Sequence, residues 1–158
     1  MHLNKNGGND LANFSSAIRK TTLKRLEEVP STFINWRLNN TAMSFAHIVK
    51  HLIHVDDLLF NLAASEETLF QWKFGTDDPH HFVTLADYEA MLAQLQVYQQ
   101  KRHALISNFS PEKMNQEVTD ENGNKMTFWW FIMRKVLEHE TYHRGQIAAY
   151  LKVLKGEA

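Results

Sequence analysis

The feature that most constrains this chain is a pair of histidines, His139 and His143, within a long helical pattern. Apolar residues recur at helical spacing from Thr127, a capping residue, to about Lys155. Residues four apart stand on the same face of a helix, and both histidines fall in the middle of the apolar face. A buried imidazole needs a hydrogen-bond partner or a metal ion. The pair therefore predicts a metal site inside a helical fold, with two buried structural histidines as the alternative.

Three further helices are predicted upstream, because apolar residues recur at helical spacing between good capping residues. Their ranges are about 10–28, capped by Asn9 or Asp10 and stopped by Pro30; about 45–62, capped by Thr41 or Ser44; and about 85–110, capped by Thr84 with Asp87 three residues on and ended by Pro111. The residues expected on their apolar faces are Leu11, Phe14, Ile18, Leu23 and Leu26 in the first, Ile48, Leu52, Val55, Leu59 and Leu62 in the second, and Leu85, Tyr88, Leu92, Leu95 and Ile106 in the third.

Two connections between these helices carry aromatic residues. Residues 31–40 hold Phe33, Ile34 and Trp36, which we expect to be buried. Residues 63–83 form a long connection with apolar anchors, and the loop-forming residues Gly75, Asp77, Asp78 and Pro79 break regular structure there. Loops of this length often act as a lid or a pocket wall. Trp72 and Phe74 could line such a pocket, but we favour a role in tying the loop to the core.

A short hairpin is predicted just before the last helix. Residues 117–126 alternate in polarity around Asn122-Gly123, the residue pair favoured in type I′ turns.

The second predicted helix carries a third histidine that could reach the pair. Beside its apolar stripe, roughly 80° round, lies a second stripe formed by His47, His51, His54 and Leu58. His51 lies nearest the apolar stripe and is the best candidate to point into a core, whereas His47 and His54 are expected at the rim or in solvent. One divalent metal ion would satisfy three such imidazoles, and nickel, zinc and iron all suit this ligand.

The remaining histidines are expected to have no such role. His103 falls near the apolar side of the third helix and is interpreted as a core or rim residue. His80 and His81 are expected to form an exposed pair in a loop.

The stretch from His139 to His143 also spells the H-E-x-x-H pattern of zinc proteases, whose Glu is the general base. A zinc protease needs a third ligand further along. The metzincin extension would have Gly and His where this chain has Gln146 and Ala149, and the only downstream carboxylate is Glu157. We therefore disfavour a protease. Glu140 lies roughly 60–100° round the helix from the histidines, so a catalytic base, a carboxylate supporting the site and a salt-bridge partner between helices all stay open.

Composition narrows the class of protein further. The net charge is -1, so no basic excess indicates nucleic-acid binding. There is no cysteine, which excludes disulfides, a cysteine nucleophile and cysteine-ligated zinc. Residues 1–8 lack the apolar region of a signal peptide, and no apolar run reaches the roughly 18 residues of a membrane span. We expect a cytoplasmic protein that contacts neither membrane nor nucleic acid.

The order of these features resembles one known family. A loop with Trp36, a helix with His51-Leu52, a hairpin and a last helix reading His139-x-x-x-His143-Arg144-Gly145-Gln146 are similar to the DinB-like family, also called the DinB/YfiT metalloenzymes. The resemblance covers nearly the whole chain. It implies one all-α domain over residues 1–158, a four-helix bundle of up-down-down-up topology with a short β-hairpin before the last helix, and a homodimer.

The resemblance also implies a site and a class of chemistry. A divalent metal would be held by His51, His139 and His143, while Arg144 and Gln146 would orient the helix. Relatives include S-transferases and isomerases that use bacillithiol, mycothiol or glutathione. The predicted function is a metal-dependent transferase or hydrolase, in which the metal lowers the pKa of a bound thiol or water that attacks a small-molecule electrophile. Glu140 is the further catalytic candidate. The alternative is a non-catalytic, metal-containing bundle that binds or senses small molecules, or acts as a stress-related protein.

Overall fold

The computed structural model describes residues 7–73, 78 and 80–156. Several positions singled out in the sequence lie outside this range, namely residues 1–6, Phe74, Gly75, Asp77, Pro79 and Glu157.

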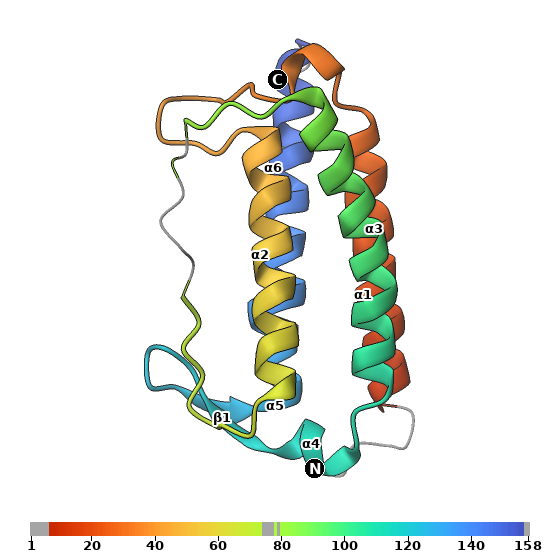
Figure 1. Cartoon of the computed structure of the whole chain (residues 1–158), viewed down its shortest axis with the longest axis vertical. Coiled ribbons are helices and arrows are strands. Elements are labelled where there is room, and N and C mark those ends of the chain that lie inside the picture. Colours follow the sequence, from red (N-terminus) through yellow and green to blue (C-terminus); the bar gives the residue numbers. More distant parts are fainter. Residues whose placement is uncertain (1–6, 74–77, 79, 157–158) are drawn as a thin grey trace.

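The described residues form a bundle of four long helical rods (Figure 1). Three rods are single helices: α1 (Gly7–Glu27), α2 (Phe45–Ala64) and α3 (Leu85–Ser107). The fourth joins α5 (Phe128–Phe131), a π-helical segment η2 (Ile132–Glu138) and α6 (His139–Leu154). In Figure 1 the chain runs up α1, down α2, down α3 and up the fourth rod. The expected four-helix bundle of up-down-down-up topology, with a hairpin before the last helix, is therefore confirmed.

Helices α1 and α2 lie across one diagonal of the bundle, and α3 and the fourth rod lie across the other. The main contacts of both α1 and α2 are with α3 and α6. Because α2 and α3 run in the same direction, the chain between them must return along the length of α2, about 30 Å for a helix of this size. This topology explains why that connection is long.

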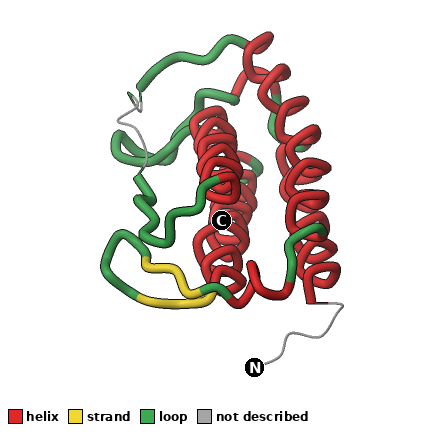
Figure 2. Tube along the Cα trace, turned by 60° about the horizontal axis from the view of Figure 1, so that its bottom comes forward, coloured by secondary structure: helices red, strands yellow, loops and turns green. Residues whose placement is uncertain are grey.

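The long connection is tied to the bundle, as we favoured. Phe70 is fully buried and Trp72 is 7% exposed. Their rings lie 4.9 and 5.1 Å from the ring of Phe131 at the start of the fourth rod. The backbone N–H of Phe70 donates to the carbonyl of Thr119, so the connection also pairs with the hairpin. Figure 2 shows the hairpin and this connection on the same side of the bundle.

The predicted hairpin is present, but the prediction of a type I′ turn is wrong. Strands β1 (Glu117–Thr119) and β2 (Lys125–Thr127) pair antiparallel, with Val118 opposite Met126. The loop spans residues 120–124, and Gly123 alone within it has a positive φ, of 81°. The Asp120 carboxylate accepts hydrogen bonds from the N–H groups of Asn122 and Asn124, at 2.9 and 2.8 Å. These bonds favour a wider loop over the two-residue turn.

Three predicted helix caps are confirmed. The side chains of Ser44, Thr84 and Thr127 each accept a hydrogen bond from the backbone N–H three residues further on. These bonds satisfy donors that a helix start leaves free.

Two predicted boundaries are wrong. The first helix begins at Gly7, so neither Asn9 nor Asp10 caps it. Pro111 does not end the third helix, which stops at Ser107; it lies in the first turn of a short helix, α4 (Pro111–Asn115), where a missing N–H carries no penalty.

The core consists of two apolar clusters separated by a polar layer. The lower cluster, toward the hairpin, includes Leu11, Val55, Ile106, Phe128 and Val136. The upper cluster, toward the opposite end, includes Leu26, Phe45, Leu52, Leu95, Ile147 and Tyr150. Between them, each rod contributes a buried polar side chain, described below as the charge layer.

Three apolar residues expected in the core or buried in a loop are exposed. Phe14 is 46%, Phe33 41% and Leu85 44% exposed. On α1 the reason is visible, because Ser15, Arg19 and Thr22 complete the inward face and are each at most 1% exposed.

Among the described residues, none of the helices combines the length and the apolar character that a membrane span requires.

The role of Asp120 can be tested by substitution. Asp120→Ala should lower the free energy of unfolding by about 1–3 kcal/mol, because it leaves the N–H groups of the loop without their acceptor. Chemical denaturation measures the change. As a control, Glu117→Ala removes an acid that is 71% exposed and 3.9 Å from Lys125, and should change stability by less than about 0.5 kcal/mol. Equal losses in the two variants would contradict this role.

Candidate metal centre

Three histidine side chains meet between α2 and α6. The Nε2 atom of His139 lies 3.0 Å from Nε2 of His51 and 3.1 Å from Nε2 of His143. Ligand atoms of the three residues all fall within 4.8 Å of one another. The structure thus brings together the three histidines singled out in the sequence, and places His51 on α2 opposite the pair on α6.

The three imidazole rings pack edge to face. Their centroids are 4.9 Å apart for His51 and His139, 5.0 Å for His51 and His143, and 4.5 Å for His139 and His143. His143 is buried at 5% exposure, while His51 and His139 are half-buried. The group therefore reaches from the core toward the surface through His139.

The start of the fourth rod differs from prediction. A regular α-helix was expected from Thr127 to about Lys155, but residues 132–138 form a π-helix that ends directly before His139. Such segments change the rotation of everything that follows. After η2, both Glu140 and His143 are buried, although their side chains point about 60° apart around the helix axis and meet different helices. No glycine or proline lies in this segment, so the sequence carried no signal for it.

A hydrogen bond sets the orientation of His143. Its Nδ1 lies 2.9 Å from Oε1 of Gln146, whose Nε2 donates to the Tyr150 hydroxyl at 2.9 Å. An amide oxygen only accepts, so Nδ1 of a neutral His143 carries the proton and Nε2 keeps its lone pair. That lone pair faces the other two rings. Sequence reasoning assigned Gln146 to orienting the helix and missed this bond, which its spacing of three residues from His143 could have indicated.

The surroundings keep all three imidazoles neutral near neutral pH. Burial, together with the neighbouring His139 and His143, lowers the pKa of His51 to about 3. Burial and the neighbouring His143 lower the pKa of His139 to about 4. Burial also lowers the pKa of His143. Neutral imidazole is the form that binds metals.

These residues fit a transition-metal ion. Metal–nitrogen bonds of about 2.0–2.1 Å to each imidazole would hold the nitrogens roughly 3 Å apart, which agrees with the 3.0 and 3.1 Å separations. Three nitrogen donors suit zinc, nickel and iron, and leave at least one coordination position open.

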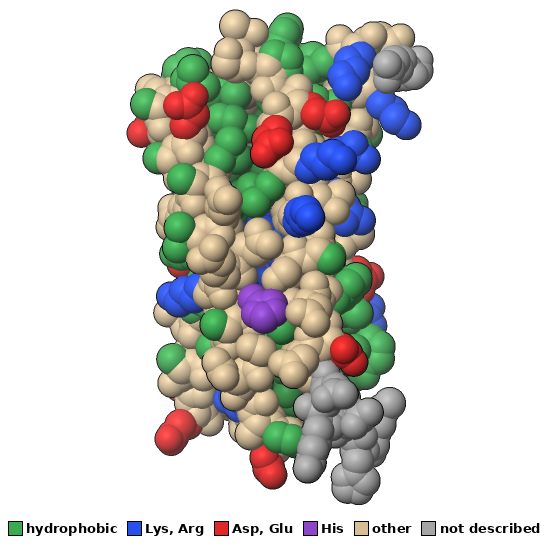
Figure 3. Space-filling view, turned by 90° about the vertical axis from the view of Figure 1, so that its right-hand side faces the viewer, with side chains coloured by type: hydrophobic (Ala, Val, Ile, Leu, Met, Phe, Trp, Pro, Cys, Tyr) green, Lys and Arg blue, Asp and Glu red, His purple; other side chains and the backbone are tan. Residues whose placement is uncertain are grey.

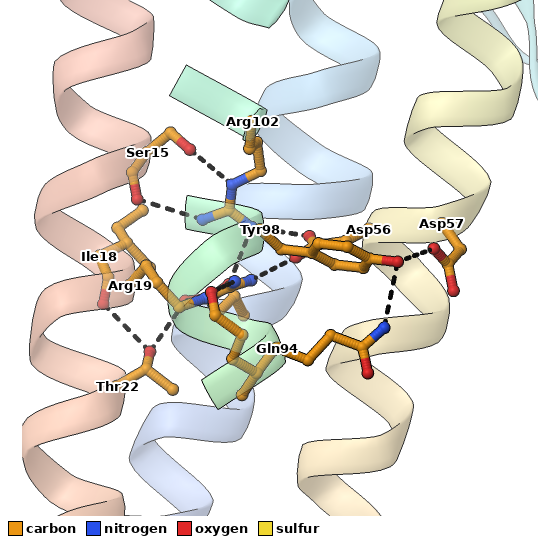
Figure 4. A network of polar contacts seen from close by, with 11 residues as sticks. Ser15, Ile18, Arg19, Thr22, Asp56, Asp57, Gln94, Tyr98 and Arg102 are labelled. Carbon is orange, nitrogen blue, oxygen red and sulfur yellow. Dashed lines mark hydrogen bonds and ion pairs between the residues drawn. The ribbon is translucent and has the colours of Figure 1, made fainter. Parts of the chain in front are cut away.

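Glu140 lies in the charge layer, which consists of Arg19 on α1, Asp56 on α2, Arg102 on α3 and Glu140 on α6. Figure 4 shows Arg19 on α1 and Arg102 on α3 pointing toward Asp56 on α2. Burial alone would raise the pKa of Glu140, but Arg102 and Arg19 outweigh it and lower that pKa to about 2. Of the roles left open for Glu140, the structure places it as a salt-bridge partner between helices. Its role as a catalytic base stays an untested prediction.

The other members of the charge layer were missed in the sequence. Arg19 lies between Leu11 and Leu26 in the apolar face of its helix, Asp56 between Leu52 and Leu59, and Arg102 between Leu95 and Ile106. Charged residues inside apolar stripes are a signal that could have found them, because such side chains are rarely buried unless paired.

Among the described residues, the histidine group itself comprises His51, His139 and His143, and five other histidines are placed outside it. His47 and His54 are half-buried, and His80 and His81 are exposed as predicted. His103 is half-buried and its Nε2 lies 3.1 Å from the side-chain oxygen of Asn13.

On the face shown in Figure 3, cationic and anionic side chains are interspersed.

A surface cavity gives access to the histidine group. It has a volume of about 280 Å³ and is lined by Arg134, Lys135, Glu138, His139 and Tyr142. Tyr142 is 69% exposed, and its ring lies 5.2 Å from that of His143. A small molecule in this cavity would contact His139 directly.

The fold and the three convergent histidines define the class of this protein as a four-helix bundle with a candidate metal site. Residues 16–147 match the model of the DinB superfamily. The chain therefore belongs to the DinB superfamily.

Two solved structures from Bacillus subtilis are similar to this chain. YjoA, a DinB-like protein, is 20% identical with a TM-score of 0.68, and the match covers 92% of each chain. YfiT is 17% identical with a TM-score of 0.71, covering 99% of this chain and 91% of its own. YfiT is described as a probable metal-dependent hydrolase with an unusual four-helix bundle topology. Comparison with curated proteins found no match. At these identities the two structures show a shared fold.

The lowered pKa values predict how stability depends on pH in metal-free protein. The unfolded histidines take up protons near pH 6.5, whereas His51 and His139 do so near pH 3 and 4 in the folded state. The unfolded state then binds more protons between these limits, so stability should fall as pH drops from about 6.5 toward 4. Denaturant unfolding of chelator-treated protein measures this slope.

The matched variant for this prediction is His51→Leu. It lacks one of the three groups and should show a shallower fall with pH over the same window. Identical slopes in the variant and the wild type would contradict the lowered pKa of His51.

Proposed function

We propose that this protein is a metal-dependent enzyme in which His51, His139 and His143 hold one divalent metal ion. The observation that carries the proposal is the convergence of three Nε2 atoms. Nε2 of His139 lies 3.0 Å from Nε2 of His51 and 3.1 Å from Nε2 of His143. The description of YfiT as a probable metal-dependent hydrolase supports it from a protein of the same fold. Zinc, nickel and iron are the metals that this ligand set suits.

The proposed reaction is hydrolysis, or transfer to a low-molecular-weight thiol. When bound, the metal supplies a Lewis acid that lowers the pKa of water or of a thiol at its open position. The chain itself holds the imidazoles neutral and fixes the proton of His143 on Nδ1 through Gln146. The cavity beside His139 and Tyr142 admits a small-molecule electrophile.

A second candidate function is a non-catalytic bundle that binds small molecules. The same cavity favours this second function, because His139 in its lining could hold a small molecule in place without any reaction. With either function, we propose that the protein is a homodimer, as the family resemblance implies, and that it is cytoplasmic. Light scattering on purified protein tests the dimer.

Metal content tests the site directly. Purified wild-type protein should carry about one divalent metal ion per chain. His143→Ala should lose most of it, because it removes the ligand whose orientation Gln146 sets. The control is His103→Ala, which removes a histidine outside the group and should retain the metal. Elemental analysis of the three proteins decides; near-zero metal in wild type after loading and desalting would refute the site.

Activity measurements distinguish the proposed enzyme from the non-catalytic bundle. We would screen metal-loaded protein with activated esters, and with electrophiles in the presence of glutathione or another low-molecular-weight thiol. The protein should turn over at least one of these two classes of substrate. His143→Ala should reduce that rate by about 100-fold or more, since it removes the metal. Product analysis distinguishes addition of water from addition of thiol. Saturable binding without turnover would instead favour the non-catalytic bundle.

A further inference from the structure

The charge layer joins all four rods of the bundle through one buried network. Arg19, Asp56, Arg102 and Glu140 come from α1, α2, α3 and α6, and none is more than 1% exposed. Two arginines face two carboxylates, so the network is neutral as a whole. It lies between the two apolar clusters, at the height where the rod of α6 also carries His143.

Glu140 is the most highly bonded carboxylate of this network. The Arg19 guanidinium donates to it through Nη2 at 2.7 Å and through Nε at 3.2 Å. Nη1 of Arg102 donates to Oε1 at 2.9 Å. The Thr22 hydroxyl lies 2.9 Å from Oε2. Both carboxylate oxygens are therefore engaged, and Glu140 has little surface from which to reach a substrate.

These bonds fix the rotation of α6 about its axis. Successive side chains on a helix point about 100° apart. Glu140 points toward α1 and α3, while its neighbour His139 and its near neighbour His143 point toward His51 on α2. A rotation that loosened Glu140 would carry both imidazoles with it. The π-helical segment ends at Glu138, so α6 begins at His139 and Glu140 lies in its first turn, beside the first of the two histidines.

We infer that Glu140 is a positioning residue, which holds His139 and His143 in register with His51 through its bonds to Arg19 and Arg102. This inference rests on the proposed metal site. Metal ligands must be held to within a few tenths of an ångström to converge on one ion. Asp56 anchors α2 to the same arginines, so both helices that supply ligands are referenced to one network.

The experiment measures Co²⁺ binding, because the absorption spectrum of bound Co²⁺ reports the geometry of its ligands. Glu140→Gln keeps the size of the side chain and removes its charge, leaving two buried arginines facing one carboxylate. We expect its Co²⁺ affinity to fall about 10- to 100-fold, with a changed spectrum. Glu140→Asp keeps the charge but shortens the side chain, and should give a smaller loss with an intermediate spectrum.

A matched control separates positioning from general loss of stability. Met114, 2% exposed, is a buried residue of α4, which holds neither a histidine of the group nor a member of the charge layer. Met114→Ala should lower the thermal midpoint as the Glu140 variants do, yet keep wild-type Co²⁺ affinity and spectrum. If Glu140→Gln does not fold, Glu140→Asp against Met114→Ala decides the question.

The outcomes distinguish the two proposals. Absence of Co²⁺ binding by the wild type would overturn the metal site itself. Wild-type binding with unchanged affinity and spectrum in the folded Glu140 variants would overturn the positioning role alone. Equal weakening in the Glu140 variants and in Met114→Ala would also overturn it, because stability would then account for the loss.

Discussion

The buried ion pairs among Arg19, Asp56, Arg102 and Glu140 are the interaction on which the rest of the structure depends. A charge removed from water costs several kcal/mol unless a partner neutralises it with good geometry. Each helix therefore has to adopt one rotation about its axis and one position along it, so that its charged side chain meets its partners on the other helices. The hydrophobic effect that acts above and below this layer is non-directional, whereas the hydrogen bonds of the layer depend on angle as well as distance. The layer specifies one arrangement of the four rods.

The histidine group uses the order that this layer provides. Its three rings come from two helices that are both bonded to the same arginines. The rings are kept neutral by burial, and Gln146 holds the proton of His143 on the nitrogen that faces away from the group. A site prepared in this way presents three neutral imidazoles, and the Nε2 lone pair of His143 faces the other two rings. Its opening toward solvent lies at His139, where the cavity begins.

Much of this arrangement could be predicted from local pattern. The caps at Ser44, Thr84 and Thr127 depend on bonds within three residues, and the pairing of His139 with His143 depends on one helical turn. His51 was found because it lies beside an apolar stripe. The turn at Asn122-Gly123 was mispredicted, because Asp120 offered the loop backbone a competing acceptor. The π-helix was not foreseen, since ordinary helix-forming residues occupy it.

By itself, the sequence determined the helices, the spacing of the two histidines on α6 and the class of ligand they form, because each is a short-range property of the chain. Tertiary structure decided what Glu140 does. Its partners Arg19 and Arg102 are 121 and 38 residues away in the sequence. The H-E-x-x-H pattern gives the glutamate the same place relative to its histidines whether it faces a substrate or two arginines. Only the packing of α1 and α3 against α6 brings those cations to it, and so turns a protease-like motif into part of a buried salt bridge.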